Sequence, residues 1–260
     1  MTPGGFDLDG KVAIVTGGGE GIGAATALLL ARCGANVVIA GRTEKTLERT
    51  SQEIERSTQR RCLGVPTDVR DEQQVERMVA RTVEAFGRID ILVNGVGWSV
   101  RSPISTMKTE LWREDFTLNL DTAFYCARAV AQHMLAQRSG AIVNISSVAG
   151  SVGVTGLAAY STAKAGVQMF TRVAAAEWGP HGIRVNCVAP GLIATDNAMK
   201  DFKAANLDVD AVCSARPLRR AGRPEEVAKV IVFLASDAAS YVTGETISVT
   251  GGPLVGGSGG

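Results

Sequence analysis

Short runs of apolar residues alternate along this chain with longer segments in which apolar residues recur every three or four positions. The runs predict buried strands over 11–16, 36–40, 61–66, 89–93, 140–146, 183–188 and 246–250. The periodic segments predict helices over 21–33, 43–57, 71–86, 109–136, 156–178 and 223–235. Strands that alternate with helices in this way predict an α/β fold: a doubly wound parallel sheet of about seven strands with helices on both faces.

The length of 260 residues fits a single domain over 1–260. Residues 192–222 break the alternation, because their polarity is mixed and only weakly periodic. Ligands of open α/β sheets bind at the carboxyl ends of the strands, so an insertion after the strand 183–188 is expected to lie over the site as a substrate lid. A plain surface excursion is the alternative. The Gly-rich tail 256–260 is expected to be flexible.

A glycine-rich turn separates the first strand from the first helix. After Thr16 the sequence reads Gly-Gly-Gly-Glu-Gly-Ile-Gly, which ends at Gly23. Glycines at such a junction let backbone N–H groups and the helix N-terminus approach a pyrophosphate. The turn therefore predicts a dinucleotide site that includes Gly17, Gly21, Ile22 and Gly23.

Tyr160 and Lys164 stand four residues apart in a predicted helix, and Ser147 follows the predicted strand 140–146. Residues i and i+4 share a helix face, so the phenol and the ammonium can reach one ligand. A free tyrosine has a pKa of about 10, and a nearby positive charge favours the phenolate. We therefore expect Lys164 to lower the pKa of Tyr160 toward the working range of a general base. A tyrosine and a lysine at this spacing are a weak signal alone, because most such pairs are an ordinary surface helix face.

Together these features resemble the short-chain dehydrogenase/reductase family in its standard-length, Tyr-x-x-x-Lys form, which has a Rossmann-type fold. The resemblance covers nearly the whole chain, and its motifs occur in the family's order. Beyond the glycine turn, the matching positions are Asp68-Val69, Asn94-Gly95-Val96-Gly97, Asn119, Ser147, Tyr160, Lys164 and the Pro-Gly-x-x-x-Thr segment from Pro190 to Thr195. Gly95 replaces the family's second asparagine, which puts a strand-supporting hydrogen bond in doubt.

The resemblance implies roles for these residues. Asp68 and Val69 would contact the adenine, and Asn94 would line the cofactor site. Four residues of the 190–195 segment would lie over the nicotinamide: Pro190, Gly191, Ile193 and Thr195. The catalytic set would be Asn119, Ser147, Tyr160 and Lys164. Hydride would pass between the nicotinamide and a carbonyl carbon, with Tyr160 as general acid or base, Ser147 on the carbonyl oxygen, Lys164 on the ribose, and Asn119 holding a water that links Lys164 to solvent.

The end of the second predicted strand bears on which nicotinamide cofactor binds. NAD sites place an Asp or Glu there for the ribose 2′-hydroxyl, whereas a nearby arginine accommodates a 2′-phosphate. Gly41 occupies the position of the acid and Arg42 follows it. A guanidinium binds phosphate well, so NADP(H) is favoured. Glu20 is a negative charge within the glycine turn and argues against a 2′-phosphate, so NAD(H) is not excluded.

Composition narrows the classes of partner. A formal net charge of +1 gives no basic footprint for nucleic acid, and five scattered cysteines with two histidines indicate free thiols and no metal site. No signal sequence and no apolar stretch of about 20 residues is evident, so we expect a cytoplasmic protein without a membrane span. By resemblance, the helices 109–136 and 156–178 would pair in a homotetramer.

Several functions remain open at this stage. A carbonyl reductase or alcohol dehydrogenase acting on a small-molecule carbonyl or alcohol is the expected activity, and a 3-oxoacyl-[acyl-carrier-protein] reductase is one alternative. A catalytically silent NADP-binding regulatory protein on the same fold is another. Nucleotide-sugar epimerases usually have longer chains, and enoyl reductases space the tyrosine and lysine more widely. The substrate itself stays open.

Overall fold

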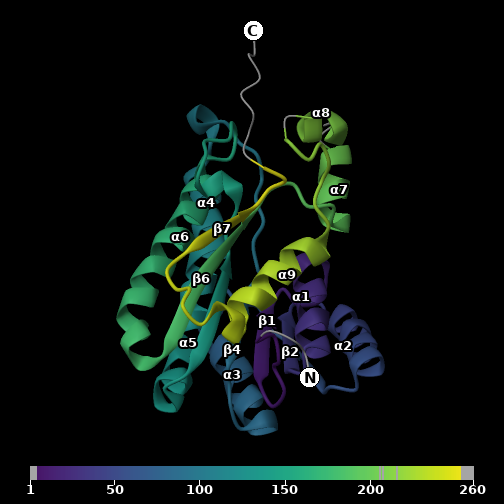
Figure 1. The fold of residues 1–260 in the computed structure, drawn as a ribbon. Helices are drawn as coiled ribbons and strands as arrows, with labels where there is room; N and C mark the ends of the chain where they lie inside the picture. Colours follow the sequence, from purple (N-terminus) through teal and green to yellow (C-terminus); the bar gives the residue numbers. More distant parts are fainter. Residues whose placement is uncertain (1–4, 205, 207, 215, 253–260) are drawn as a thin grey trace.

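One parallel sheet of seven strands organises the protein, whose computed structural model describes residues 5–252 apart from 205, 207 and 215 (Figure 1). The strands are β1 (Val12–Thr16), β2 (Asn36–Gly41), β3 (Cys62–Pro66), β4 (Ile91–Asn94), β5 (Gly140–Ile145), β6 (Ile183–Pro190) and β7 (Thr246–Val249). Their order in the sheet is β3-β2-β1-β4-β5-β6-β7, and every neighbouring pair is parallel. The predicted doubly wound α/β fold is confirmed. The Gly-rich tail 256–260 lies outside the described residues.

Helices cover both faces of this sheet. They are α1 (Gly21–Arg32), α2 (Glu44–Thr58), α3 (Glu72–Phe86), α4 (Thr109–Phe116), α5 (Thr122–Gln137), α6 (Ala158–Trp178), α7 (Asp196–Ala204), α8 (Val209–Ser214) and α9 (Pro224–Ala235). Short 3-10 turns lie at Ile104–Thr106, Val148–Gly150, Gly179–His181 and Asp237–Ala239. In Figure 1, α1, α2 and α9 lie on one side of the sheet, and α3, α5 and α6 on the other.

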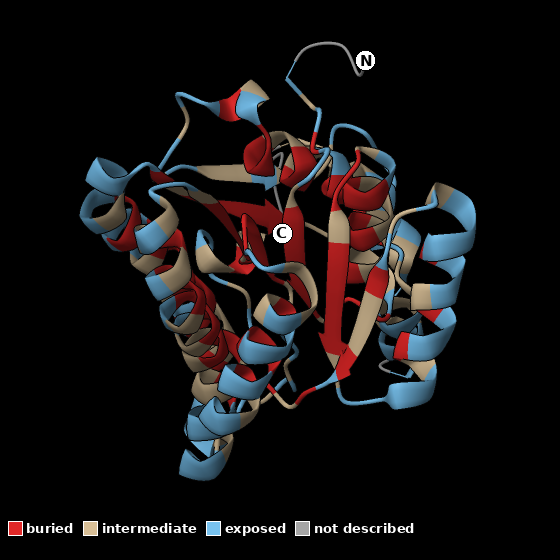
Figure 2. Ribbon diagram, turned by 90° about the horizontal axis from the view of Figure 1, so that it is seen from below, coloured by how far each residue is buried: buried red, intermediate tan, exposed pale blue. Residues whose placement is uncertain are grey.

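The sheet carries two apolar cores, one on each face, and Figure 2 shows its central strands buried between helices whose outer surfaces are exposed. Alternate strand residues point to opposite faces. In β1, for example, Ala13 and Val15 join the core under α1 and α9, whereas Ile14 joins the core under α3 and α5. Burial on both faces explains why the strands read as continuous apolar runs.

The strand order reverses direction between β1 and β4. The chain winds from β1 toward β3 on one side and from β4 toward β7 on the other. Such a switch point leaves a crevice at the carboxyl ends of the strands, where ligands of this fold class bind. Since β1, β4 and β5 all end there, the glycine turn, Asn94 and Ser147 reach the same edge.

Two segments differ from the sequence prediction. The helix expected over 109–136 is interrupted by a π-helical turn, Thr117–Asp121, between α4 and α5. The segment 192–222, expected to be irregular, contains α7 and α8 among its described residues. These two helices lie together beyond the carboxyl end of the sheet (Figure 1).

Candidate active site

The glycine turn between β1 and α1 has a backbone that only glycine fits. Gly17 and Gly21 adopt positive φ values of 68° and 53°. A Cβ on Gly23 would lie 2.1 Å from the carbonyl oxygen of Gly17. Glu20 is the N-cap residue of α1, and within the described part of the chain its side chain makes no capping hydrogen bond. The first N–H groups of the helix, at Ile22 and Gly23, are therefore open to an anion. This cradle fits a pyrophosphate.

The end of β2 lies beside the segment that follows β3. Arg42 is exposed there. The hydrogen bond from Arg70, 2.5 Å long, lowers the pKa of Asp68, and the charge of Arg42 acts in the same direction. Val69 is buried next to this pair. The expected adenine and ribose-phosphate residues therefore come together at one end of the crevice.

Ser147, Tyr160 and Lys164 converge from β5 and α6. The buried Lys164 donates a hydrogen bond from Nζ to the carbonyl of Ile145, at 3.0 Å, and its Nζ lies 5.7 Å from the centre of the Tyr160 ring. Ser147 Oγ accepts the N–H of Ala149 at 3.1 Å. This bond uses a lone pair of the serine oxygen, and the O–H of Ser147 donates toward the phenol of Tyr160. The phenol, ammonium and hydroxyl are thus held by buried structure at the sheet edge.

The expectation that the pKa of Tyr160 is lowered toward the working range is wrong for this structure. Burial raises the pKa of Tyr160; a hydrogen bond from Ser147 opposes that rise, and the charge of Asp115 adds to it. Burial also lowers the pKa of Lys164 to about 8. The physical reason is desolvation. Burial disfavours the phenolate of Tyr160 and the ammonium of Lys164, and at their separation the two charges do not compensate for it. At neutral pH the phenol therefore keeps its proton.

Asn119 lies in the π-helical turn between α4 and α5, and its side chain is buried. Its Oδ1 accepts the N–H of Trp98 at 3.0 Å, and its Nδ2 donates to the carbonyls of Trp98, at 2.7 Å, and Asp115, at 3.0 Å. A Cβ on Gly97 would lie 2.7 Å from Lys164 Nζ and 2.8 Å from Asn119 Oδ1. The segment after β4 therefore passes directly over the lysine, and a larger residue than glycine here would displace the end of Lys164 or Asn119. π-Turns of this kind occur often at functional sites.

Asn94 is turned into the sheet. Its Nδ2 donates to Asn144 Oδ1 at 2.9 Å and to the carbonyl of Ala123 at 3.3 Å. The side chain therefore ties β4 to β5 and to α5. At the departure from the family pattern, the N–H of Gly95 donates to Thr16 Oγ1 at 3.0 Å, so β1 and β4 are still linked at this edge.

The segment after β6 lies against the glycine turn. A Cβ on Gly21 would lie 3.1 Å from Thr195 Cγ2. Thr195 Oγ1 accepts the N–H of Ala198 in the first turn of α7, and the buried Ile193 pairs with Gly222 in an isolated bridge. Pro190 ends β6, and Gly191 packs beside Thr250, the residue after β7. The four expected residues of this segment thus form the base of the α7–α8 segment, next to the cofactor cradle.

Three residues near this site were not singled out from the sequence. Asp115 is a buried carboxylate one helical turn before Asn119, and Gln168 is a buried amide one turn after Lys164. Trp98 follows the glycine that approaches Lys164. The spacing of four from a candidate catalytic residue was the available signal for Asp115 and Gln168.

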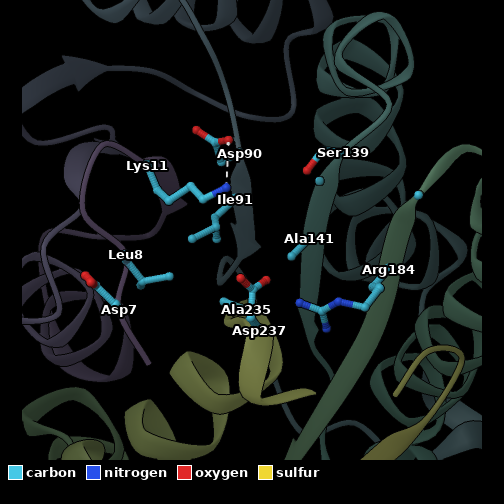
Figure 3. Close-up of a pocket in the computed structure, with 12 residues that line it drawn as sticks. Asp7, Leu8, Lys11, Asp90, Ile91, Ser139, Ala141, Arg184, Ala235 and Asp237 are labelled. Atoms are coloured by element: carbon cyan, nitrogen blue, oxygen red, sulfur yellow. Dashed lines mark ion pairs between the residues drawn. The ribbon is translucent and has the colours of Figure 1, made fainter. Parts of the chain in front are cut away.

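A small pocket of about 90 Å³ lies at the opposite, amino ends of the strands (Figure 3). Its buried acid, Asp90, accepts hydrogen bonds from Arg88 and from the N–H of Val12, and Lys11 lies 3.8 Å away. Arg184 donates to the carbonyls at the end of α9. These charges are already paired, so the pocket is a structural cluster.

The part of the chain that the structure describes contains neither a candidate metal site nor a candidate membrane-spanning helix. No group of three or more His, Cys, Asp or Glu side chains there could hold a metal ion. Nor does any helix within those residues have the length and apolar character needed to cross a membrane.

The fold and this site define a dinucleotide-dependent oxidoreductase of the Rossmann class. The sequence model of the family described as enoyl-(acyl carrier protein) reductase matches residues 17–253. The chain is 43% identical over 250 residues to the short chain dehydrogenase/reductase astE of Aspergillus oryzae. The matched region covers 95% of this chain and 96% of the relative. It therefore belongs to the short-chain dehydrogenase/reductase family, whose members use nicotinamide cofactors.

Two further relatives show how wide the family is. A 3-oxoacyl-[acyl-carrier-protein] reductase of Synechocystis is 42% identical over 249 residues, covering 95% of this chain and 98% of that protein. The crystal structure of gox2181 superposes with a TM-score of 0.90 at 38% identity, covering 95% of this chain and 96% of that one.

Proposed function

We propose that this enzyme transfers hydride between NADP(H) and a ketone or secondary alcohol, with Tyr160 as the general acid or base. The observation that carries the proposal is the convergence of Tyr160, Lys164 and Ser147 at the edge where the glycine turn ends. A carbonyl oxygen placed there would meet two hydroxyl donors and a buried ammonium.

The roles of the side chains follow from their contacts. When bound, the nicotinamide supplies the hydride for reduction and accepts it in oxidation. Ser147 would donate its O–H in a hydrogen bond to the substrate oxygen in place of its present partner Tyr160, while the N–H of Ala149 occupies one of its lone pairs. Tyr160 gives its proton to that oxygen as negative charge develops on it. Since burial raises the pKa of Tyr160, the resting enzyme carries the proton that reduction needs.

Lys164 and Asn119 support the tyrosine. Lys164 is held by Ile145, and its ammonium would stabilise the phenolate left after proton transfer and bind the cofactor ribose. Asn119 would hold a water that returns the proton from solvent through Lys164. The hydrogen bonds between the backbone of Trp98 and the buried side chain of Asn119 keep these groups together.

The preference for NADP(H) rests on Arg42. It is exposed at the end of β2, where no acid precedes it, and it lies close enough to act on Asp68. The 2′-phosphate would be bound by this guanidinium, and the pyrophosphate by the open start of α1. Glu20 is the opposing charge; it lies 3.4 Å from Asn197 Nδ2 at the start of α7. That contact favours α7 and α8 as a lid over the cofactor and substrate, as expected for 192–222.

The direct test is NADPH oxidation with a ketone panel that includes ethyl acetoacetate and cyclohexanone, for the wild type and Tyr160→Phe. General acid–base groups contribute about 10²–10⁴-fold, so turnover of the variant should fall by at least that lower factor. Its affinity for NADPH, measured by fluorescence titration, should stay unchanged. Wild-type-like turnover in Tyr160→Phe would refute the role of the tyrosine.

A 3-oxoacyl-[acyl-carrier-protein] reductase activity is the second candidate, because a relative of that name matches nearly the whole chain. A faster reduction of a 3-oxoacyl thioester than of any free ketone would favour it. Reduction of an enoyl thioester's carbon–carbon double bond, by contrast, would favour the activity in the family description. The four-residue spacing of Tyr160 and Lys164 argues for the carbonyl.

Self-association through α5 and α6 is part of the proposal. Phe124 on α5 and Met169 and Val173 on α6 are 40–54% exposed, and the Phe124 ring meets the edge of Phe170 at 6.2 Å between centroids. This apolar face would form one two-fold interface of the homotetramer that the family resemblance implies, and a second interface would join the two dimers. Light scattering at micromolar concentration should give four times the 27.2 kDa chain mass, and Met169→Glu should reduce it. A wild-type mass equal to one chain would refute the assembly.

A further inference from the structure

A buried hydrogen-bond network joins the segment that carries Ser147 to the helix that carries Tyr160 and Lys164. Its centre is the side-chain amide of Gln168, which is 8% exposed and lies on α6 one turn beyond Lys164. Gln168 Nε2 donates to Ser146 Oγ at 3.2 Å and to the carbonyl of Ser147 at 3.4 Å. The amide thus touches the backbone of the serine itself.

The network continues on both sides of the amide. Ser146 Oγ donates to the carbonyl of Lys164 at 2.8 Å, which closes a loop from α6 to β5 and back. Ser151 Oγ donates to Gln168 Oε1 at 3.2 Å and lies 3.1 Å from Nε2. Residues 146–151 are therefore attached to α6 at both ends, through one side chain.

The same region packs too closely to move without breaking these bonds. A Cβ on Gly150 would lie 2.7 Å from the carbonyl carbon of Lys164 and 2.8 Å from Gln168 Nε2. Because the loop rests directly on the backbone of α6, the amide fixes its position along the helix. Ser147 Oγ depends on that position, since it sits between the two attachment points.

We propose that Gln168 is a positioning residue that holds the hydroxyl of Ser147 in register with the phenol of Tyr160. The proposal rests on the carbonyl reduction proposed above. Gln168 does not touch the reacting atoms; it acts through Ser147. A displacement of about 1 Å of a catalytic group can cost about 10²-fold in rate, so the effect of losing the amide is large enough to measure.

The test is a double-mutant cycle between Gln168→Met and Ser147→Ala, with kcat for NADPH-dependent reduction of ethyl acetoacetate as the readout. Methionine keeps the length of the side chain and removes its hydrogen bonds. In the wild-type background we expect Gln168→Met to lower kcat by about 10- to 100-fold. In the Ser147→Ala background the same change should cost less than about threefold, because residues that act as a unit are not additive.

Controls separate positioning from stability. Ser151→Ala removes the contacts of Ser151 Oγ with the amide at the exposed end of the network but leaves those to Ser146 and Ser147. It should therefore lower kcat less than Gln168→Met does and should also lose its effect beside Ser147→Ala. It decides the matter if Gln168→Met does not fold. Gln52→Met, the same change on the exposed face of α2, should leave kcat unchanged. NADPH affinity should be the same in all folded variants.

Equal losses in both backgrounds would overturn the proposal and assign Gln168 a general structural role. Unchanged kcat in Gln168→Met and Ser151→Ala would overturn it as well, with the proposed function intact. No turnover by the wild type on ethyl acetoacetate, cyclohexanone or a 3-oxoacyl thioester would instead refute the proposed function, and the positioning role with it.

Discussion

The side chain of Asn119 binds the backbone of Trp98 from both directions: its Oδ1 accepts the N–H at 3.0 Å, and its Nδ2 donates to the carbonyl at 2.7 Å. The asparagine stands in the π-helical turn between α4 and α5, and the tryptophan follows Gly97, which lies against Lys164. One side chain therefore connects the helix break to the segment over Lys164.

Replacing Asn119 with leucine should weaken both the fold and the reaction. Two backbone groups of Trp98 lose their partner, which costs about 1–3 kcal/mol when such groups stay unsatisfied. Urea unfolding should show that loss, and kcat should fall at least about tenfold as the 97–98 segment shifts. Asn119→Asp keeps the acceptor for the N–H of Trp98 but places an oxygen where Nδ2 donates to the carbonyls of Trp98 and Asp115, so it should lose stability as well. Equal stability of all three proteins would contradict this function of the side chain.

Lys164→Met should lower both turnover and affinity for NADPH, because we assign the lysine to the tyrosine and to the ribose. The Lys164→Met protein should still fold, and the pH dependence of its stability should differ from that of the wild type. Burial lowers the pKa of Lys164 to about 8, so between that value and its ordinary 10.5 the unfolded chain binds the extra proton and wild-type stability rises with pH. Methionine cannot titrate, so this rise should be absent in the variant. A loss of turnover alone, with NADPH affinity unchanged, would remove the ribose from the assignment.

The strands and most helices could be predicted from the sequence, because burial on both faces leaves continuous apolar runs and half-burial leaves helical periodicity. The prediction failed at the π-helical turn Thr117–Asp121. No glycine or proline within 109–136 marks a break, so the segment reads as one helix. The helices α7 and α8 were missed for a different reason: few of their residues are buried, so no apolar stripe marks them.

The candidate site followed from its motifs as far as chemistry is local in sequence. The pairing of Tyr160 with Lys164, and the glycine turn, depend on neighbours along one helix or one turn. The roles of Gln168 and Asp115 could not be predicted in this way. They depend on contacts with the segment after β5 and with α6, which come together only in the fold. The predicted direction of the pKa shift of Tyr160 was wrong because burial, which periodicity does not quantify, is the largest cause of that shift.

Asp115→Asn should move the pH profile of alcohol oxidation toward lower pH. Oxidation needs the Tyr160 phenolate, and the charge of Asp115 is one cause that raises the pKa of that tyrosine. Removing the charge should lower this pKa, so the oxidation rate should rise at a lower pH. Glu114→Gln removes the exposed neighbouring carboxylate and should shift the profile less. An unchanged profile in Asp115→Asn would show that the carboxylate does not act on the tyrosine.

Stability gives a second readout for Asp115→Asn. Burial raises the pKa of Asp115 above 3.8, with the charge of Glu114 adding to the shift. The folded state therefore binds more protons than the unfolded chain in a window that begins near 3.8, and wild-type stability falls as pH rises through it. Asparagine removes that loss. The Tm of the variant minus that of the wild type should therefore be larger at pH 7 than at pH 3. A smaller difference at pH 7 would contradict the cited cause.

Arg42→Ala tests the choice of cofactor. If the guanidinium binds the 2′-phosphate, its loss should weaken NADPH binding by about 1.5–3 kcal/mol, the range of a hydrogen bond to a charged group. NADH carries no such phosphate and should be little affected. The ratio of kcat/KM for the two cofactors should therefore shift by about tenfold or more toward NADH, since 1.4 kcal/mol is one decade. Arg49→Ala, on the exposed face of α2, serves as the charge-matched control.

Gly41→Asp should push the preference further, because it offers the ribose hydroxyls an acceptor and repels the phosphate. The fold tolerates the change: a Cβ at Gly41 meets only Leu47 Cδ2, at an ordinary 3.6 Å. The competing charge is Glu20, which could already disfavour NADPH from within the glycine turn. A wild-type preference for NADH would show that Glu20 outweighs Arg42, and an equal loss with both cofactors in Arg42→Ala would show that the arginine binds no 2′-phosphate.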